Sequence, residues 1–176
     1  KWEYTNTVSK ITLSMCLADA GIVRVTYFPG AVPEDEPSYA VSPGYSAPGA
    51  EIREYDEDGV HVVETSLLRI RIRTEEQKVD FYDVATDEPL LTDEGGFGRE
   101  SKDWTGDARV WIRKNLQETE HFFGLGDKPC ALNLRGKYFS MWGADHYDFH
   151  EESDPLYKSI PFFLSLRERK AYGLLF

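Results

Sequence analysis

Strict alternation of apolar and charged residues is the feature that most constrains how this chain can fold. Residues 68–73 read Leu-Arg-Ile-Arg-Ile-Arg, which places three aliphatic side chains on one face of an extended chain and three arginines on the other. Residues 79–83 follow after a short polar turn and are predicted to form the partner strand of a hairpin. Because acidic residues are abundant, we expect Arg69, Arg71 and Arg73 to pair with Asp or Glu across strands on a hydrated face.

The same period of two recurs along the chain, and no segment carries the pattern of an amphipathic helix. Further strands are predicted at residues 11–17, 22–28, 109–114, 138–142, 160–166 and 171–176. With many strands and no alternation with helices, we predict an all-β fold, an antiparallel two-sheet β-sandwich. Its 176 residues fit one domain, residues 1–176. Two loops interrupt the pattern, a proline-rich one at residues 29–49 and a polar one at 143–155.

Charge and composition narrow the classes of partner. Asp and Glu number 31 against 20 Lys and Arg, so the formal net charge is −11. An acidic surface repels phosphate backbones and anionic lipids, so we expect no nucleic-acid and no membrane partner. No apolar run approaches the roughly 18 residues of a membrane-spanning helix. Cys16 and Cys130 lie far apart in the sequence and are predicted to be buried thiols rather than a disulfide.

The polar loop and the residue before it carry side chains suited to sugar binding. Carbohydrates are held by an aromatic ring against their C–H face and by carboxylates that accept hydrogen bonds from their hydroxyl groups. Trp142, Asp145 and Tyr147 have the residue types for these contacts. The alternative is that Trp142 belongs to the core and Asp145 only caps a turn.

Two other chemistries of this loop remain open from the residues alone. His146, Asp148 and His150 alternate, so an extended chain would place them on one face, as in a zinc site, although no further ligand is evident. The paired acids Asp145/Asp148 and Glu151/Glu152, with Asp154, could supply the two carboxyl groups of glycoside hydrolysis. A plain solvated loop is the better explanation of both patterns, because neighbouring polar and acidic side chains on such a loop are normally exposed, so we expect neither a metal nor a cofactor.

Several short motifs in the last third of the chain resemble a known family. Residues 122–128 read Phe-Phe-Gly-Leu-Gly-Asp-Lys, residues 132–136 Leu-Asn-Leu-Arg-Gly, and residues 142–145 Trp-Gly-Ala-Asp. Residues 155–163 and 171–176 continue with Pro-Leu-Tyr-Lys-Ser-Ile-Pro-Phe-Phe and Ala-Tyr-Gly-Leu-Leu-Phe. This order is similar to the N-terminal domain of glycoside hydrolase family 31, the α-glucosidase and α-xylosidase family. Asp127 stands where that family usually has Glu, and Gly143 where Asn is common.

The resemblance implies a galactose-mutarotase-like sandwich that packs against a downstream catalytic (β/α)₈ barrel. It implies that the chain is a piece of a retaining α-glucosidase that ends shortly before the sandwich is complete, with both catalytic aspartates on the barrel and none here. Asp145 and Tyr147 would contact substrate hydroxyls, and Trp142 would lie beside them. The substrate would be an α-linked oligosaccharide, from which the enzyme hydrolyses terminal α-linked glucose, or xylose in an α-xylosidase.

Two other functions stay open from the sequence. An autonomous carbohydrate-binding module would need an aromatic platform on a rigid face, and a free-standing mutarotase would need a His and a Glu across a concave sheet. The sequence leaves open whether the protein forms a homo-oligomer. It also leaves open whether it resides in the cytoplasm or is exported to the periplasm or medium of a bacterium.

Overall fold

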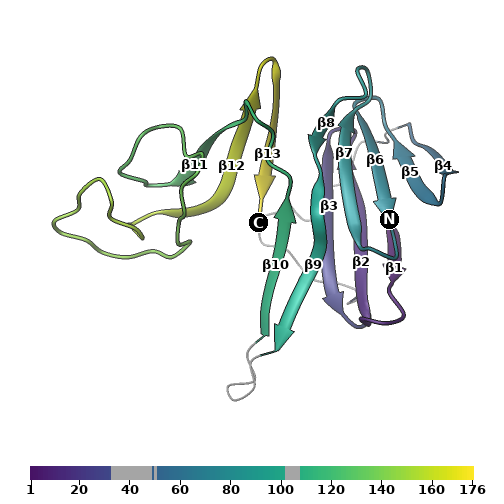
Figure 1. Ribbon diagram of the computed structural model, residues 1–176, viewed down its shortest axis with the longest axis horizontal. Helices are drawn as coiled ribbons and strands as arrows, with labels where there is room; N and C mark the ends of the chain where they lie inside the picture. Colours follow the sequence, from purple (N-terminus) through teal and green to yellow (C-terminus); the bar gives the residue numbers. More distant parts are fainter. Residues whose placement is uncertain (33–48, 50, 102–107) are drawn as a thin grey trace. The chain divides into compact units, whose positions relative to one another are not determined.

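A computed structural model describes residues 1–32, 49, 51–101 and 108–176, and it contains strands but no helix in these ranges (Figure 1). The predicted loop at residues 29–49 lies mostly outside the described residues. Thirteen strands occur in the described ranges: β1 (Trp2–Thr5), β2 (Ile11–Asp19), β3 (Ile22–Pro29), β4 (Arg53–Glu57), β5 (Val60–Glu64), β6 (Leu68–Arg73), β7 (Lys78–Asp83), β8 (Pro89–Leu91), β9 (Asp93–Ser101), β10 (Ala108–Lys114), β11 (His121–Gly126), β12 (Ser159–Arg167) and β13 (Lys170–Leu175). None of the described residues forms a helix of the length and apolarity needed to cross a membrane.

The chain divides into two compact units, Lys1–Asn115 and Leu116–Phe176, which are described separately. Unit 1 contains a three-stranded sheet β1-β2-β3, a five-stranded sheet β4-β5-β6-β7-β8 and the pair β9-β10. Unit 2 contains one three-stranded sheet, β11-β12-β13. All strand pairs are antiparallel. The organisation of residues 1–176 as a single domain stays a prediction.

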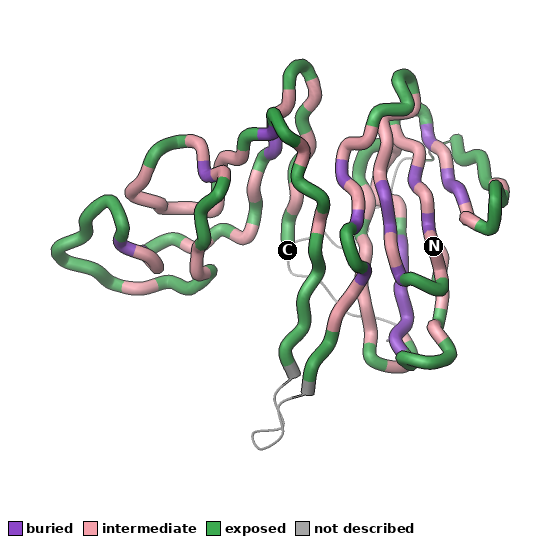
Figure 2. Tube along the Cα trace, in the orientation of Figure 1, coloured by how far each residue is buried: buried purple, intermediate pink, exposed green. Residues whose placement is uncertain are grey.

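The core of unit 1 lies between its two larger sheets. Leu13 and Met15 of β2 pack with Ile70 and Ile72 of β6, and all four side chains are buried. Figure 2 marks buried residues on several strands of this unit in purple. Each buried aliphatic side chain contributes about 1.5–3 kcal/mol relative to exposure. One core shared by two antiparallel sheets is the sandwich arrangement, and the prediction of an all-β two-sheet fold is confirmed.

The hydrated face of β6 shows the predicted charge pairing. Arg69 Nε lies 2.6 Å from a carboxylate oxygen of Glu64, and Arg71 Nη2 lies 2.6 Å from one of Glu57. Arg73 pairs with Asp80, whose side chain is buried on β7. The prediction that these arginines pair with acidic residues is therefore confirmed.

Unit 2 is organised around a buried carboxylate. Glu120, which precedes β11, is 2% exposed and accepts hydrogen bonds from Ser165 Oγ, from Tyr172 OH at 2.7 Å and from the backbone N–H of Gln117 at 3.0 Å. Phe163 lies beside them, with its ring centroid 6.4 Å from that of Tyr172. One side chain thus joins the turn before β11 to β12 and β13.

Two predictions from the sequence are wrong. Residues 138–142 form no strand, although four of these five residues are aromatic or apolar. They lie in the long connection between β11 and β12, and none of the described strands pairs with them. Cys16 is exposed rather than buried, although Thr12 and Ser14 on the same face of β2 are buried; Cys130 is half-buried, and both thiols are free.

Candidate functional site

The candidate site lies in the segment that connects β11 to β12, residues 127–158, which we call the connecting loop. Its two ends are adjacent, because Gly126 pairs with Ser159 and the Asp127 N–H donates to the Lys158 carbonyl at 3.0 Å. The glycine at this point is required by space as well as by conformation. Gly126 has a φ of +86°, and a Cβ added there would lie 2.2 Å from the Lys158 carbonyl oxygen.

Gly124 and Gly126 lie within β11, at an irregularity in its pairing with β12. Gly124, Leu125 and Gly126 all have positive φ values there, which bends the strand end from which the connecting loop departs.

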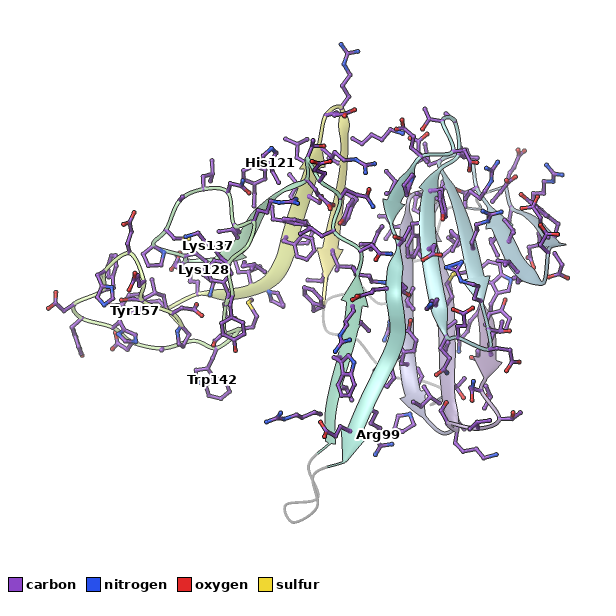
Figure 3. The ribbon with its side chains drawn as sticks, viewed as in Figure 1. Arg99, His121, Lys128, Lys137, Trp142 and Tyr157 are labelled. Atoms are coloured by element: carbon purple, nitrogen blue, oxygen red, sulfur yellow. The ribbon has the colours of Figure 1, made fainter. Side chains whose placement is uncertain are left out.

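The three side chains predicted to bind sugar all lie on the connecting loop and all face solvent. Trp142 is 73% exposed and projects from the loop (Figure 3). Tyr147 is 95% exposed, and Asp145, between them in the sequence, is also exposed. Within the described part of the chain, no hydrogen bond or ion pair is formed by the Asp145 carboxylate. The alternatives that Trp142 is a core residue and that Asp145 caps a turn are therefore wrong.

The backbone on both sides of Asp145 is nevertheless anchored. The Ala144 N–H donates to the Leu156 carbonyl at 3.0 Å, and Leu156 is buried. The Tyr157 hydroxyl donates to the His146 carbonyl. The Asp145 carboxylate thus projects from a peptide segment held at the residue before it and at the residue after it.

The loop requires no glycine at position 143, where the family motif usually has Asn. Gly143 is not among the residues with positive φ, and an added Cβ would meet only the Tyr157 carbonyl oxygen at 3.4 Å, an ordinary contact. The loop conformation seen here therefore accommodates either residue.

A buried ion pair lies inside the connecting loop. The Lys128 ammonium group, with a side chain 3% exposed, pairs with Asp154 and donates to the Ser140 carbonyl at 3.2 Å. Asp154 also accepts from the Ser140 N–H. Burial raises the pKa of Asp154, but the hydrogen bonds from Lys128 and Ser140 and the Lys128 charge outweigh it, so the pKa lies below its ordinary value.

The other chemistries considered for the loop are not assembled. No group of three His, Cys, Asp or Glu side chains placed to hold a metal ion occurs in the described ranges, and His146, Asp148 and His150 form none. His150 instead bonds locally: its N–H donates to Ser153 Oγ at 2.9 Å, and its Nδ1 accepts from the Glu152 N–H at 3.2 Å. These contacts shape a turn of the loop.

Comparison with known proteins places this geometry in a family. A family model described as the glycosyl hydrolase 31 N-terminal galactose mutarotase-like domain matches residues 12–176. The chain belongs to this family. The all-β sandwich of the structure agrees with a galactose-mutarotase-like fold, and the connecting loop lies within the matched residues.

Individual family 31 proteins share parts of this chain. "Alpha-glucosidase 2" of Bacillus thermoamyloliquefaciens is 38% identical over 80 residues, which are 45% of this chain and 10% of that protein. A family 31 dextranase of Flavobacterium johnsoniae, solved with isomaltotriose, superimposes with a TM-score of 0.70 at 29% identity over 90% of this chain and 19% of its own. A family 31 α-xylosidase of Xanthomonas citri shares the fold, with a TM-score of 0.69 at 18% identity over 93% of this chain and 17% of its own. The chain spans about a tenth of the length of the curated relatives.

Sequence reasoning found the exposed residues of the site but missed those that hold them. Lys128 and Tyr157 were read only as parts of motifs, and Ser140 was placed in a strand. No local signal marks these residues as partners, because 26 positions separate Lys128 from Asp154 and 11 separate Tyr157 from His146.

Proposed function

We propose that this chain is the non-catalytic N-terminal domain of a retaining α-glucosidase. It lends the connecting loop to the rim of a substrate site whose catalytic barrel lies elsewhere in the whole protein, and it packs against that barrel. The observation that carries the proposal is the display of Trp142, Asp145 and Tyr147 on a loop whose backbone is anchored on both sides of Asp145. Membership of family 31 and likeness to a protein named as an α-glucosidase support it.

The side chains are suited to an α-linked oligosaccharide. The Asp145 carboxylate is a strong acceptor for sugar hydroxyls and has no competing partner among the described residues. Trp142 offers an aromatic face for the C–H side of a pyranose, and Tyr147 adds a ring with a polar tip. Anchored backbone lowers the entropic cost of ordering these groups around a substrate.

The reacting carboxylates are not in this chain under our proposal. A retaining glycosidase needs a carboxyl group with a raised pKa as its general acid, placed about 5 Å from a nucleophilic carboxylate. Asp154, a half-buried carboxylate of the connecting loop, has a lowered pKa and is paired with Lys128. Asp145 is exposed and serves binding rather than proton transfer.

Two alternatives rest on particular observations. The structural likeness to a dextranase at 29% identity and to an α-xylosidase favours a parent enzyme with another substrate within the same family. The exposed rings of Trp142 and Tyr147 would also serve a carbohydrate-binding module that acts alone.

A paired assay tests the proposal. The 176-residue chain and the whole protein that contains it are compared on maltose, isomaltose, aryl α-glucosides and aryl α-xylosides, and sugar binding to the chain alone is measured by calorimetry. We expect turnover of α-glucosides by the whole protein only. If the whole protein prefers isomaltose-type oligomers, the parent enzyme is a dextranase rather than an α-glucosidase. If it prefers xylosides, the parent enzyme is an α-xylosidase. Turnover by the chain alone would refute a non-catalytic role, and millimolar or tighter sugar binding to it would favour the binding module.

A further inference from the structure

The buried charge of Lys128 needs a reason, because a lysine side chain is among the most costly to remove from water. An ammonium group buried without a partner is destabilising by several kcal/mol, and even a well-paired one is often no more stable than an apolar pair of the same size. Lys128 is 3% exposed, and its partner Asp154 is 17% exposed. General stability is therefore a weak explanation for this pair.

Among the residues that the structure describes, the Lys128 ammonium group has its polar and ring contacts within the connecting loop. It pairs with the Asp154 carboxylate, donates to the Ser140 carbonyl at 3.2 Å, and lies 5.0 Å from the centroid of the Phe139 ring. Asp154 in turn accepts from the Ser140 N–H. Lys128, Ser140 and Asp154 therefore form a closed triangle of hydrogen bonds, which we call the clasp.

The position of the clasp in the loop gives it a specific consequence. Ser140 and Asp154 are the two ends of the segment 140–154, and the clasp joins these ends to each other and to Lys128, which lies two residues after the end of β11. Trp142, Asp145 and Tyr147 all lie inside this segment. Closing its ends removes conformational freedom from the part of the loop that displays these side chains.

We propose that Lys128 and Asp154 are positioning residues for substrate recognition: through the clasp they hold the segment 140–154 in the conformation that presents Asp145. This inference rests on the proposed function of the loop. Neither residue touches the sugar. Without the clasp the segment samples more conformations, and the apparent affinity falls with the fraction that remains competent to bind. We expect Lys128→Met to lower kcat/KM by about 10- to 100-fold, mainly through a higher KM.

The test combines kinetics with peptide-resolved hydrogen exchange on the whole protein. The variants are Lys128→Met, Asp154→Asn and the double variant Lys128→Met/Asp154→Leu, which removes both charges. Lys114→Met is the matched control, because Lys114 also pairs with a buried carboxylate, that of Asp93, but lies in unit 1. We expect each clasp variant to speed exchange in residues 141–153 more than in β12, while Lys114→Met leaves both exchange there and KM unchanged.

The double variant separates positioning from stability. The double variant should recover much of the melting temperature that Lys128→Met loses, because it leaves no unpaired buried charge. Its rate of hydrogen exchange in residues 141–153 and its KM should nevertheless stay above those of the unmodified protein. Recovery of KM together with the melting temperature would overturn the proposal, as would unchanged exchange in residues 141–153. Faster exchange with unchanged KM would also overturn it.

Asp145→Ala is assayed in parallel, because it distinguishes an error in the proposed function of the loop from an error in the positioning proposal for the clasp. If it leaves kcat/KM unchanged, the proposed role of the loop is wrong, and the positioning proposal fails with it. If Asp145→Ala impairs the enzyme and the clasp variants do not, only the positioning proposal is wrong.

Discussion

Replacing Glu120 with alanine should destabilise unit 2 more than any exposed substitution in it. The carboxylate is 2% exposed and accepts hydrogen bonds from the Ser165 and Tyr172 hydroxyls and from the Gln117 N–H. Alanine removes the acceptor and leaves these donors in place. A buried donor that loses its acceptor costs about 1–3 kcal/mol, because its desolvation is no longer offset.

The size of the effect follows from which donors can reach water. Ser165 is buried and Tyr172 half-buried, so we assign about 1–2 kcal/mol to each hydroxyl, and about 0.8 kcal/mol to the lost methylene. The Gln117 N–H lies in a turn and can be hydrated. Glu120→Ala should therefore lower the free energy of unfolding by about 3–5 kcal/mol. Glu120→Gln keeps an oxygen for the two hydroxyls but turns an amide N–H toward Gln117, so it should cost only about 1–2 kcal/mol.

The assay is urea unfolding combined with peptide-resolved hydrogen exchange, so that β12 and β13 are read separately from unit 1. Glu118→Ala is the matched control, because Glu118 is exposed two residues away and should change the unfolding free energy by less than about 0.5 kcal/mol. Equal effects of Glu118→Ala and Glu120→Ala would refute the reasoning, as would a Gln variant less stable than the Ala variant.

Two further predictions concern the loop base and alkaline pH. Gly126→Ala should lower the free energy of unfolding by more than about 2 kcal/mol, because the added Cβ would lie 2.2 Å from the Lys158 carbonyl oxygen. Gly143→Ala should lower it by less than about 0.5 kcal/mol, and thermal unfolding of the two variants tests the difference. Burial and nearby carboxylates raise the pKa of Tyr4 to about 12, so its protonated form favours the fold. This contribution is full below about pH 10, the ordinary tyrosine value, and is lost as pH rises through about 12; urea midpoints that stay constant over this range would contradict it.

Much of the fold is predictable from the sequence because local patterns determine it. The alternation in residues 68–73 specifies both a strand and the face that is buried, and β6 spans Leu68–Arg73. Its arginines pair with acidic residues because few other partners exist on a hydrated face of so acidic a chain. Patterns of this kind need no knowledge of distant residues.

The same logic fails where long-range contacts decide. The run at residues 138–142 has the residue types of a strand, but none of the strands that the structure describes pairs with it, and the hydrogen bonds of Ser140 in the clasp hold it as part of the connecting loop. Burial of Cys16 was predicted because free cysteines are usually buried, whereas its exposure depends on how far along β2 other segments cover the strand: Thr12 and Ser14 on the same face are buried.

The candidate site was predictable in part. Trp142, Asp145 and Tyr147 were singled out because their types suit sugars and their order resembles a family motif, and all three are displayed on the loop. Their support was not predictable, since an ion pair across 26 residues leaves no local trace. Glu120 was missed for the same reason, as its partners lie on β12 and β13.

The most direct test of the account is the kinetics of Asp145→Ala in the whole enzyme. Asp148→Ala is the matched control, because it removes another exposed carboxylate from the same loop. We predict that Asp145→Ala lowers kcat/KM on α-linked disaccharides by a factor equivalent to about 1–3 kcal/mol, while Asp148→Ala leaves it within twofold. Unchanged kinetics for Asp145→Ala, or equal losses for the two variants, would contradict the claim that this loop presents Asp145 to the substrate.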